Sequence, residues 1–259
     1  MYQMPQITFT GPDDNTDIQR LLTLEVGYRH LEYGILFSES RRGTPRYPTD
    51  AWIERLVEAS GSYLNLSAHF CGKIARDTLA GDDKWVKALP MRSVQMKSPA
   101  FRRIQLNGYD PTNPIHVGSV VSLAMTTPYT YILQARSMSD YLLAGDTAAT
   151  FTKTNPIGHG HGKLAVLYDP SGGKGLTAKV WPEATPIAPV GFAGGINPDN
   201  VREVLTAIGY RQPTVPGHPA YWIDMESGVR TDEKFDLAKC QRVLDVQQEV
   251  WYQWQSLRT

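Results

Sequence analysis

Short apolar runs recur along the chain, and each is followed by a longer stretch of mixed apolar and polar residues. Runs of this length that end in Gly, Asp or Ser are typical of strands buried in a parallel sheet. We expect eight strands, over residues 7–10, 33–37, 64–70, 103–106, 130–134, 164–168, 190–193 and 221–225.

The stretches between these runs have the spacing of amphipathic helices. The clearest are 50–59, with Trp52, Ile53, Leu56 and Val57 on one face, and 198–208, with Val201, Val204, Leu205 and Ile208 on one face. Thr49 precedes the first segment as a predicted N-cap, and Asn197 followed by Pro198 predicts the start of the second.

Alternating strands and helices predict a parallel sheet, and eight such units in 259 residues are what a closed (β/α)8 barrel requires. We therefore expect an α/β chain with a single TIM-barrel domain over residues 1–259. No stretch is rich enough in Pro, Gly or Ser to divide it. An open doubly wound sheet is the alternative, but no GxGxxG motif follows the first strand, which weakens a dinucleotide-binding interpretation.

Composition narrows the function classes. The chain carries 26 Lys plus Arg and 26 Asp plus Glu, so the basic surplus that a nucleic acid polymer attracts is missing. Its apolar runs are far shorter than the roughly 18 to 20 residues of a membrane span. The first residues, MYQMPQITFTGPDD, do not resemble a secretory signal, and the two cysteines, Cys71 and Cys240, predict no disulfide framework. We expect a cytoplasmic protein with no membrane or nucleic acid partner.

Candidate chemistry follows the last three predicted strands, because active sites of such barrels lie at the carboxyl ends of the strands. The segments there are DPSGGKG (169–175), AGGIN (193–197) and DMESGV (224–229). Glycines allow main-chain amides to approach an anion, and a helix amino terminus adds a favourable dipole. Each segment alone predicts only a tight turn. Together they predict a phosphate cradle.

A second glycine-rich segment, GHGHG over 158–162, precedes the sixth strand. Its two histidines have the spacing of metal ligands, but no further Cys or carboxylate completes a recognisable site. We favour a surface loop or lid over a metal site.

The strings GILFSESRRGTPRYP, RIQLNG, LYDPSGGKG, VGFAGGINPDNV and WIDMESGVRT occur in an order and spacing that resemble phosphoribosylanthranilate isomerase, a barrel of tryptophan synthesis. The resemblance runs from the second strand to the eighth. It implies an Amadori rearrangement, in which an aminoaldose becomes an aminoketose without metal or organic cofactor. Such a reaction needs an acid for the ring oxygen and a base for the C2 proton.

The resemblance also assigns roles to residues. It places the general acid at Asp169, whose alternative is a carboxylate that caps the turn before Gly172. It places the phosphate cradle at Gly194, Gly195, Ser227 and Gly228, with Gly173 and Gly175 nearby. It makes Arg46 a clamp for a substrate carboxylate, since a guanidinium can bind a carboxylate with two hydrogen bonds. The alternative for Arg46 is an exposed pair with Glu39 or Asp50.

One departure affects the base. The family has Cys followed by Gly at the end of the first strand, where this chain has Thr10 and Gly11. A threonine hydroxyl is too weak a base to replace a thiolate unaided. Cys71 follows the third strand, and His69, two residues earlier, should face the same side. A neighbouring imidazole can lower a thiol pKa, so we expect Cys71 as a replacement base; a buried structural Cys and His are the alternative.

Other polar residues should surround the mouth and orient the ligand, among them Asp224 on the eighth strand. Gln105 and Asn107 lie on the fourth strand, and Asn107 stands where the family usually has His. Glu226 stands where the family more often has Ser, and would repel a phosphate unless it points away or pairs with Arg230 or Lys174.

Three hypotheses follow. The first is an aldose–ketose isomerase, formally an intramolecular oxidoreductase, acting on an N-glycosylated phosphosugar. The second is a divergent enzyme of the same scaffold that acts on another phosphorylated sugar or nucleotide. The third is a non-catalytic module that binds such a metabolite. All three predict a small phosphorylated ligand and a monomer or homodimer.

Overall fold

Eight strands alternate with helices along the computed structural model, which describes residues 4–28, 31–61, 64–93, 98–155, 163–172, 175–178, 180–182, 188–209 and 221–256. The eight longer strands are β1 (Gln6–Thr10), β2 (Leu31–Phe37), β3 (Leu66–Phe70), β6 (Arg103–Leu106), β7 (Thr130–Ala135), β8 (Leu164–Tyr168), β9 (Val190–Ala193) and β10 (Trp222–Met225). The helices are α1 (Ile18–Gly27), α2 (Asp50–Ser60), α3 (Gly72–Leu79), α4 (Lys84–Lys87), α5 (Pro114–Thr126), α6 (Met138–Thr154), α7 (Val201–Ile208) and α8 (Leu237–Ser256).

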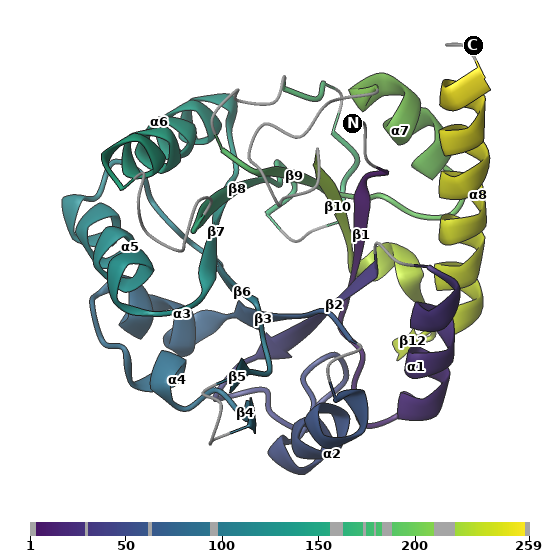
Figure 1. Cartoon of the computed structure of the whole chain (residues 1–259), viewed down its shortest axis with the longest axis horizontal. Helices are drawn as coiled ribbons and strands as arrows, with labels where there is room; N and C mark the ends of the chain where they lie inside the picture. The colour runs from purple at the N-terminus through teal and green to yellow at the C-terminus, as the bar shows by residue number, and fades with distance from the viewer. Residues whose placement is uncertain are drawn as a thin grey trace.

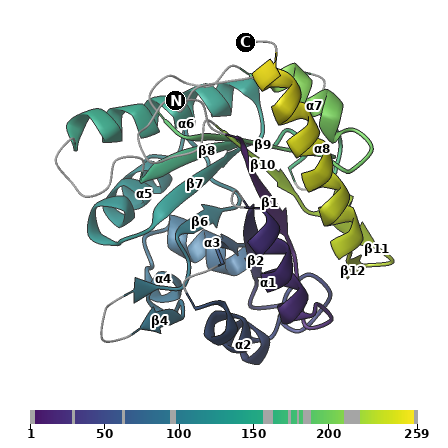
Figure 2. The ribbon, with the colours of Figure 1, turned by 45° about the vertical axis from the view of Figure 1, so that its right-hand side comes forward.

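These strands form a closed barrel in the order β1-β10-β9-β8-β7-β6-β3-β2, and every neighbouring pair is parallel. Figure 1 looks along the barrel, with the helices arranged around it. Figure 2 shows α8 lying beside α1 and α7 on the outside. The predicted (β/α)8 fold is confirmed, because β10 returns to β1 and leaves no sheet edge.

The connection from β8 to β9 departs from the regular alternation. Its described residues contain no helix, and Trp181 instead packs edge-on against Phe192, with ring centroids 5.8 Å apart. Two small antiparallel pairs that the sequence pattern did not predict are β4 (Met91–Ser93) with β5 (Ser98–Pro99), and β11 (Arg230–Thr231) with β12 (Lys234–Phe235). A short 3-10 turn, η1 (Ser227–Val229), follows β10.

The two predicted helix starts had different outcomes. The Thr49 hydroxyl accepts a hydrogen bond from the Trp52 main-chain N–H at 3.3 Å, so this N-cap is confirmed. The start at Pro198 is wrong, since α7 begins at Val201 with Asn200 as its N-cap. The Asn197 side chain accepts from the main-chain N–H of Asp199 at 2.8 Å, and this local turn delays the helix.

Strand side chains alternate between two environments. Ile7 and Phe9 of β1 are fully buried in the core between the barrel and its helices. Thr8 and Thr10, at the alternate positions, are also buried but form polar contacts inside the barrel. Along β1 the period of two therefore separates an apolar outer face from a polar inner face, while a second buried apolar cluster is formed by Ile132, Ala165, Leu167, Ala193 and Trp222.

The interior below the mouth is crossed by a buried ion pair. Arg103 of β6 donates to both carboxylate oxygens of Glu32 on β2, and Thr8 donates to Glu32 at 3.0 Å. The Arg103 guanidinium also lies over the Trp222 ring, 4.3 Å from its centroid. Since β2, β6 and β10 are not adjacent in the sheet, these contacts span the barrel and form a floor beneath the mouth.

Two further sequence predictions concern the rest of the chain. Cys240 is fully buried in α8, as expected of a packing residue. The histidines of the 158–162 segment lie outside the described residues. No described helix is long and apolar enough to cross a membrane.

Candidate active site

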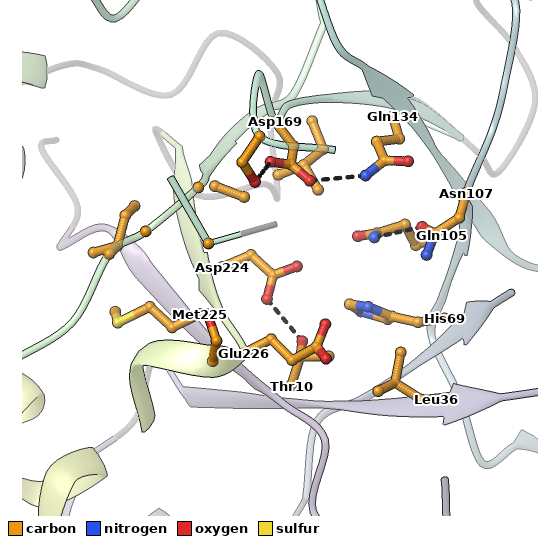
Figure 3. A pocket seen from close by; sticks show the side chains of 18 residues that line it. Thr10, Leu36, His69, Gln105, Asn107, Gln134, Asp169, Asp224, Met225 and Glu226 are labelled. Atoms are coloured by element: carbon orange, nitrogen blue, oxygen red, sulfur yellow. Dashed lines mark hydrogen bonds between the residues drawn. The ribbon is translucent and has the colours of Figure 1, made fainter. Parts of the chain in front are cut away.

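A cavity opens at the carboxyl ends of the barrel strands. Its volume is about 60 Å³, and all eight strands or the residues just after them contribute to its wall. Figure 3 shows the side chains that converge there, including Thr10, His69, Gln105, Asn107, Gln134, Asp169, Asp224 and Glu226. The barrel thus brings together most of the residues that the sequence singled out.

Asp169 lies just after β8 with both carboxylate oxygens engaged. Gln134 Nε2 donates to Oδ2 at 2.8 Å, and Ser171 Oγ donates to Oδ1 at 2.7 Å. Its main-chain N–H bonds to the Ala135 carbonyl at 2.9 Å, which extends the pairing of β7 with β8. The carboxylate is therefore fixed on the cavity wall, where it can meet a ligand.

A second carboxylate, Asp224 of β10, faces the same cavity. Thr10 Oγ1 donates to Asp224 Oδ1 at 2.7 Å, and both side chains are buried. Burial, with the negative charges of Glu226 and Glu32, raises the pKa of Asp224 to about 7. The Thr10 hydrogen bond and the Arg103 charge act in the opposite direction. Asp224 can therefore be protonated or ionised near neutral pH.

The expected pair of His69 and Cys71 does not form as predicted. His69 lines the central cavity, but its Nε2 lies 3.1 Å from Ser67 Oγ, and burial lowers its pKa to about 4. The Cys71 thiol bonds instead to the His69 main-chain carbonyl, at 3.7 Å. Burial and the charge of Glu226 raise the pKa of Cys71 to about 12, opposite to the expected direction. A neutral imidazole that contacts Ser67 gives the thiol no compensating positive charge.

Gln105 and Asn107 form a chain of hydrogen bonds across one wall. Gln105 Nε2 donates to Asn107 Oδ1 at 2.9 Å, and Asn107 Nδ2 donates to Cys71 Sγ at 3.2 Å. Among the described residues, Gln105 Oε1 has no partner although it is buried. An unsatisfied buried acceptor on a cavity wall is suited to a hydroxyl or N–H of a ligand.

The glycine loops after β8, β9 and β10 meet at one side of the cavity, as predicted. Gly175, Gly194, Gly195 and Ser227 lie on its wall. Gly195 has φ of 61°, and a Cβ there would lie 2.4 Å from the Thr177 main-chain nitrogen, so the loops after β8 and β9 pack backbone to backbone.

One predicted phosphate residue lies elsewhere, and another cannot be compared. Gly228 does not line the cavity; a Cβ there would lie 2.0 Å from the Ile196 carbonyl oxygen, so its glycine is required by packing. Gly173 lies outside the described residues. The amino terminus of α7 begins only at Val201, six positions after Gly195, so its dipole is farther from the cavity than the sequence suggested.

Arg46 lies at the rim of the mouth in an ion-paired arrangement. Its Nη1 lies 3.0 Å from Glu226 Oε1, and its Nη2 lies 3.1 Å from Glu233 Oε2. Neither Glu39 nor Asp50 is its partner. Of the two partners predicted for Glu226, Arg230 pairs instead with Asp13 at 2.9 Å, and Lys174 lies outside the described residues.

A larger cavity of about 1160 Å³ adjoins the central one. It is lined by Arg41, Tyr47, Cys71 and Arg76 among others. The walls of the two cavities share Leu36, Asn107 and Glu226. An elongated ligand could therefore occupy both, with one end at the glycine loops. Within the described part of the chain, no group of three or more His, Cys, Asp or Glu side chains is placed to hold a metal ion.

The fold and its mouth define a barrel protein with a polar site that three carboxylates line. No family model and no curated protein sequence matches the chain. Among solved structures, TrpF from Jonesia denitrificans is 18% identical with a TM-score of 0.55, covering 95% of this chain and 98% of that one. Phosphoribosyl anthranilate isomerase from Thermotoga maritima is 15% identical with a TM-score of 0.56, covering 95% and 100%.

A third similar structure is phospho-2-dehydro-3-deoxyheptonate aldolase from Thermotoga maritima, 12% identical with a TM-score of 0.51, covering 96% of this chain and 69% of that one. At such identities the likeness establishes the fold alone. The two isomerase structures share the (β/α)8 fold of this chain, which agrees with the barrel that the sequence resemblance implied. Because an aldolase shares this architecture, activity has to be argued from the site.

Sequence reasoning undervalued Asp224 and did not foresee its partner. Asp224 was expected only to orient a ligand. Thr10 was considered only because it stands where the family has Cys. The available signal was the alternation of side chains along β1 and β10, which places Thr8, Thr10 and Asp224 on the same side of the sheet. Thr8 is the register partner of Asp224, so Thr10 lies two residues closer to the mouth. Ser171, which holds Asp169, was also missed, although it lies two residues after that carboxylate.

Proposed function

We propose that the chain is an aldose–ketose isomerase, which converts an N-glycosylated phosphosugar to an aminoketose by an Amadori rearrangement. The observation that carries this proposal is the arrangement of Asp169 on the cavity wall beside the glycine loops of β8, β9 and β10. The sequence resemblance to phosphoribosylanthranilate isomerase and the likeness of fold support the same reaction.

In this proposal the phosphate lies against Gly175, Gly194, Gly195 and Ser227. Main-chain amides at glycines suit an anion because they carry no side chain that would block its approach. The sugar then lies over Asp169, and the aglycone extends into the larger cavity past Asn107. Each end of the ligand thus meets a different part of the mouth.

Asp169 is the proposed general acid. Protonated Asp169 gives its proton to the ring oxygen of the sugar, the C1–O bond breaks, and the nitrogen lone pair forms a C=N bond to C1. Gln134 and Ser171 keep the carboxyl group oriented for this transfer. No oxidant or reductant is needed, because the rearrangement moves hydrogen within one molecule. An enzyme that acts on a small metabolite fits the expected cytoplasmic location, which stays a prediction.

The test is a turnover assay with a panel of N-substituted 5-phosphoribosylamines, including N-(5′-phosphoribosyl)anthranilate generated in the reaction. Proton NMR detects the C1 methylene of the aminoketose. We expect turnover on at least one member, and a loss of about 10² to 10⁴-fold for Asp169→Asn. Asp146→Asn, at an exposed position of α6, is the matched control and should leave the rate unchanged.

Binding without turnover by the wild-type chain would overturn the proposal and favour the non-catalytic module. Turnover of other phosphorylated sugars or nucleotides, with every panel member inert, would favour the divergent enzyme. Restored growth without tryptophan in a strain lacking the isomerase would identify the aglycone as anthranilate.

A further inference from the structure

Thr10 and Asp224 meet where the barrel closes. They are 214 residues apart in sequence, and their 2.7 Å hydrogen bond joins the first barrel strand to the last. This bond engages Oδ1 of Asp224. Among the described residues, no hydrogen bond donor contacts Oδ2, and Figure 3 shows the carboxylate directed into the cavity. One oxygen is thus held while the other can meet a ligand.

The groups around Asp224 come from several strands. Glu32 of β2 and Glu226 after β10 are negative, and Arg103 of β6 is positive but bound to Glu32. The other titratable groups on the cavity wall are His69 of β3 and Asp169 after β8. Because burial and two carboxylates outweigh one engaged guanidinium, the pKa of Asp224 rises to about 7. A carboxylate with this pKa is a stronger base than an ordinary one.

We infer that Asp224, positioned by Thr10, removes the C2 proton of the substrate and so replaces the thiol that the first strand lacks. The inference rests on the proposed function. On this inference the base is a residue of the last barrel strand and not of the first. Thr10 stays beside the reacting carbon and acts as a positioning residue. Asp169 follows β8 and Asp224 lies on β10, and only β9 separates these two strands.

The step balances within the substrate. After Asp169 has protonated the ring oxygen and C1 has become an iminium carbon, the Asp224 carboxylate takes the proton from C2. The C2–H electron pair becomes a C1=C2 bond, and the C=N electron pair returns to nitrogen. Asp224 then returns a proton to C1 while the C2 hydroxyl releases its own proton to solvent, which yields the ketone. Solvent in turn reprotonates Asp169.

Cys71 is less suited to this step. It lines the larger cavity and not the central one, and its thiol bonds to the His69 carbonyl and Asn107. The Thr10 hydroxyl is a weaker base still, but as a donor it fixes the carboxylate next to it. Asp224 and Cys71 therefore differ as candidate bases in position as well as in chemistry.

The experiment compares Asp224→Asn, Cys71→Ser and the exposed control Asp146→Asn with whichever panel substrate the wild-type chain turns over. We expect Asp224→Asn to lose about 10² to 10⁴-fold in kcat with KM within a few-fold. Cys71→Ser should leave kcat within about threefold of wild type, and any change should fall on KM, because Cys71 lines the larger cavity that holds the aglycone. In D₂O, the wild type should place deuterium at C1 of the product to the extent that protonated Asp224 exchanges with solvent before it returns the proton. Near-full turnover by Asp224→Asn, or a comparable loss in Cys71→Ser, would overturn the inference while the proposed function stands.

Thr10 is tested by its effect on the pH profile. Wild-type kcat/KM should rise with pH through an apparent pKa near 7, since the base must be ionised. Thr10→Val removes a bond that stabilises the carboxylate, so this limb should move to higher pH, and Thr10→Ser should restore it. A purely structural role would lower the rate without moving the limb.

Infrared spectroscopy tests the inference without a substrate, and so applies even if no member of the panel is turned over. The carboxylate stretch in infrared difference spectra should show a group that titrates near pH 7 in the wild type and in Asp169→Asn and is lost in Asp224→Asn, while Glu25, whose pKa burial raises to about 8, contributes equally in all three chains. Circular dichroism verifies that each variant is folded. Titration of Asp224 below pH 5 would overturn the inference whatever the panel shows.

Discussion

Arg46 Nη1 lies 3.0 Å from Glu226 Oε1, so the arginine that the resemblance assigns to a substrate carboxylate already binds a carboxylate of its own chain. Glu233 provides a second, more exposed partner at 3.1 Å. The Arg46 main-chain N–H also donates to Asp13 at 2.8 Å, at a residue with φ of 77°. A carboxylated aglycone would therefore have to compete with Glu226 for the guanidinium.

Glu226→Gln should increase affinity for an anionic aglycone. The substitution removes the competing charge and leaves Arg46 available, so we expect benzoate, as a probe, to bind roughly tenfold more tightly at low salt. Calorimetric titration measures the change. Glu233→Gln is the matched control and should have a smaller effect, because this partner is exposed. Equal affinities for wild type and Glu226→Gln would show that Arg46 does not meet the anion.

Cys71 should react slowly with alkylating agents in the folded protein. Burial raises its pKa to about 12, and only the thiolate is nucleophilic, so iodoacetamide at pH 8 should modify it at least roughly a hundredfold more slowly than a free thiol. Mass spectrometry follows the modification, with the denatured chain as control, in which both cysteines should react. Rapid labelling at Cys71 would indicate a lowered pKa and would revive its candidacy as the base.

Asp224→Asn should stabilise the fold at alkaline pH. The folded-state pKa is raised from 3.8 to about 7, so the native state binds more protons between these values, and the wild type loses stability as pH rises through 7. Asparagine removes the buried charge and can still accept from Thr10. The free energy of unfolding of the variant relative to wild type should rise between pH 4 and pH 8, by at most about 4 kcal/mol. Urea denaturation measures it; a difference independent of pH would contradict the assignment.

Glu32→Gln should destabilise the barrel strongly. It leaves the buried Arg103 guanidinium without its countercharge, for which about 3 to 5 kcal/mol is the usual loss. The double variant Glu32→Gln with Arg103→Met should recover most of this loss, since no unpaired charge is left inside. Chemical denaturation compares the three chains. If the double variant were no more stable than the single one, the ion pair would contribute more than mutual neutralisation.

Inorganic phosphate should bind at the glycine loops of the wild type, and Ser227→Glu should weaken this binding. The new carboxylate lies on the cavity wall, where it repels an anion, so we expect at least roughly tenfold weaker binding by calorimetry. Ser122→Glu, at an exposed position of α5, is the matched control. Unchanged phosphate affinity in Ser227→Glu would remove these loops from the proposed site.

The fold could be predicted from the chain because its signals are local. Buried runs such as 164–168 and 190–193 coincide with β8 and β9, and the alternation with helices implies a closed sheet. The start of α7 could not be placed, because the Asn197 side chain competes with the helix for main-chain donors. That competition depends on the geometry of a single turn.

The site was only partly predictable, because titration depends on what surrounds a group. Asp169 and the glycine loops follow from their positions after strands. The lowered pKa of His69 does not, since the Glu32–Arg103 pair comes near it only in the closed barrel, although Ser67 is its neighbour two residues earlier on β3. The same closure gives Asp224 its hydrogen bond and its negative surroundings.

The junction of β1 with β10 also has a consequence for synthesis of the protein. Thr10 leaves the ribosome early and Asp224 late, so the proposed proton acceptor has no positioning partner until the last barrel strand docks. A nascent chain that lacks β10 could display Asp169 but could not complete the reaction. On this view the protein becomes catalytically active only after β10 has paired with β1 and closed the barrel.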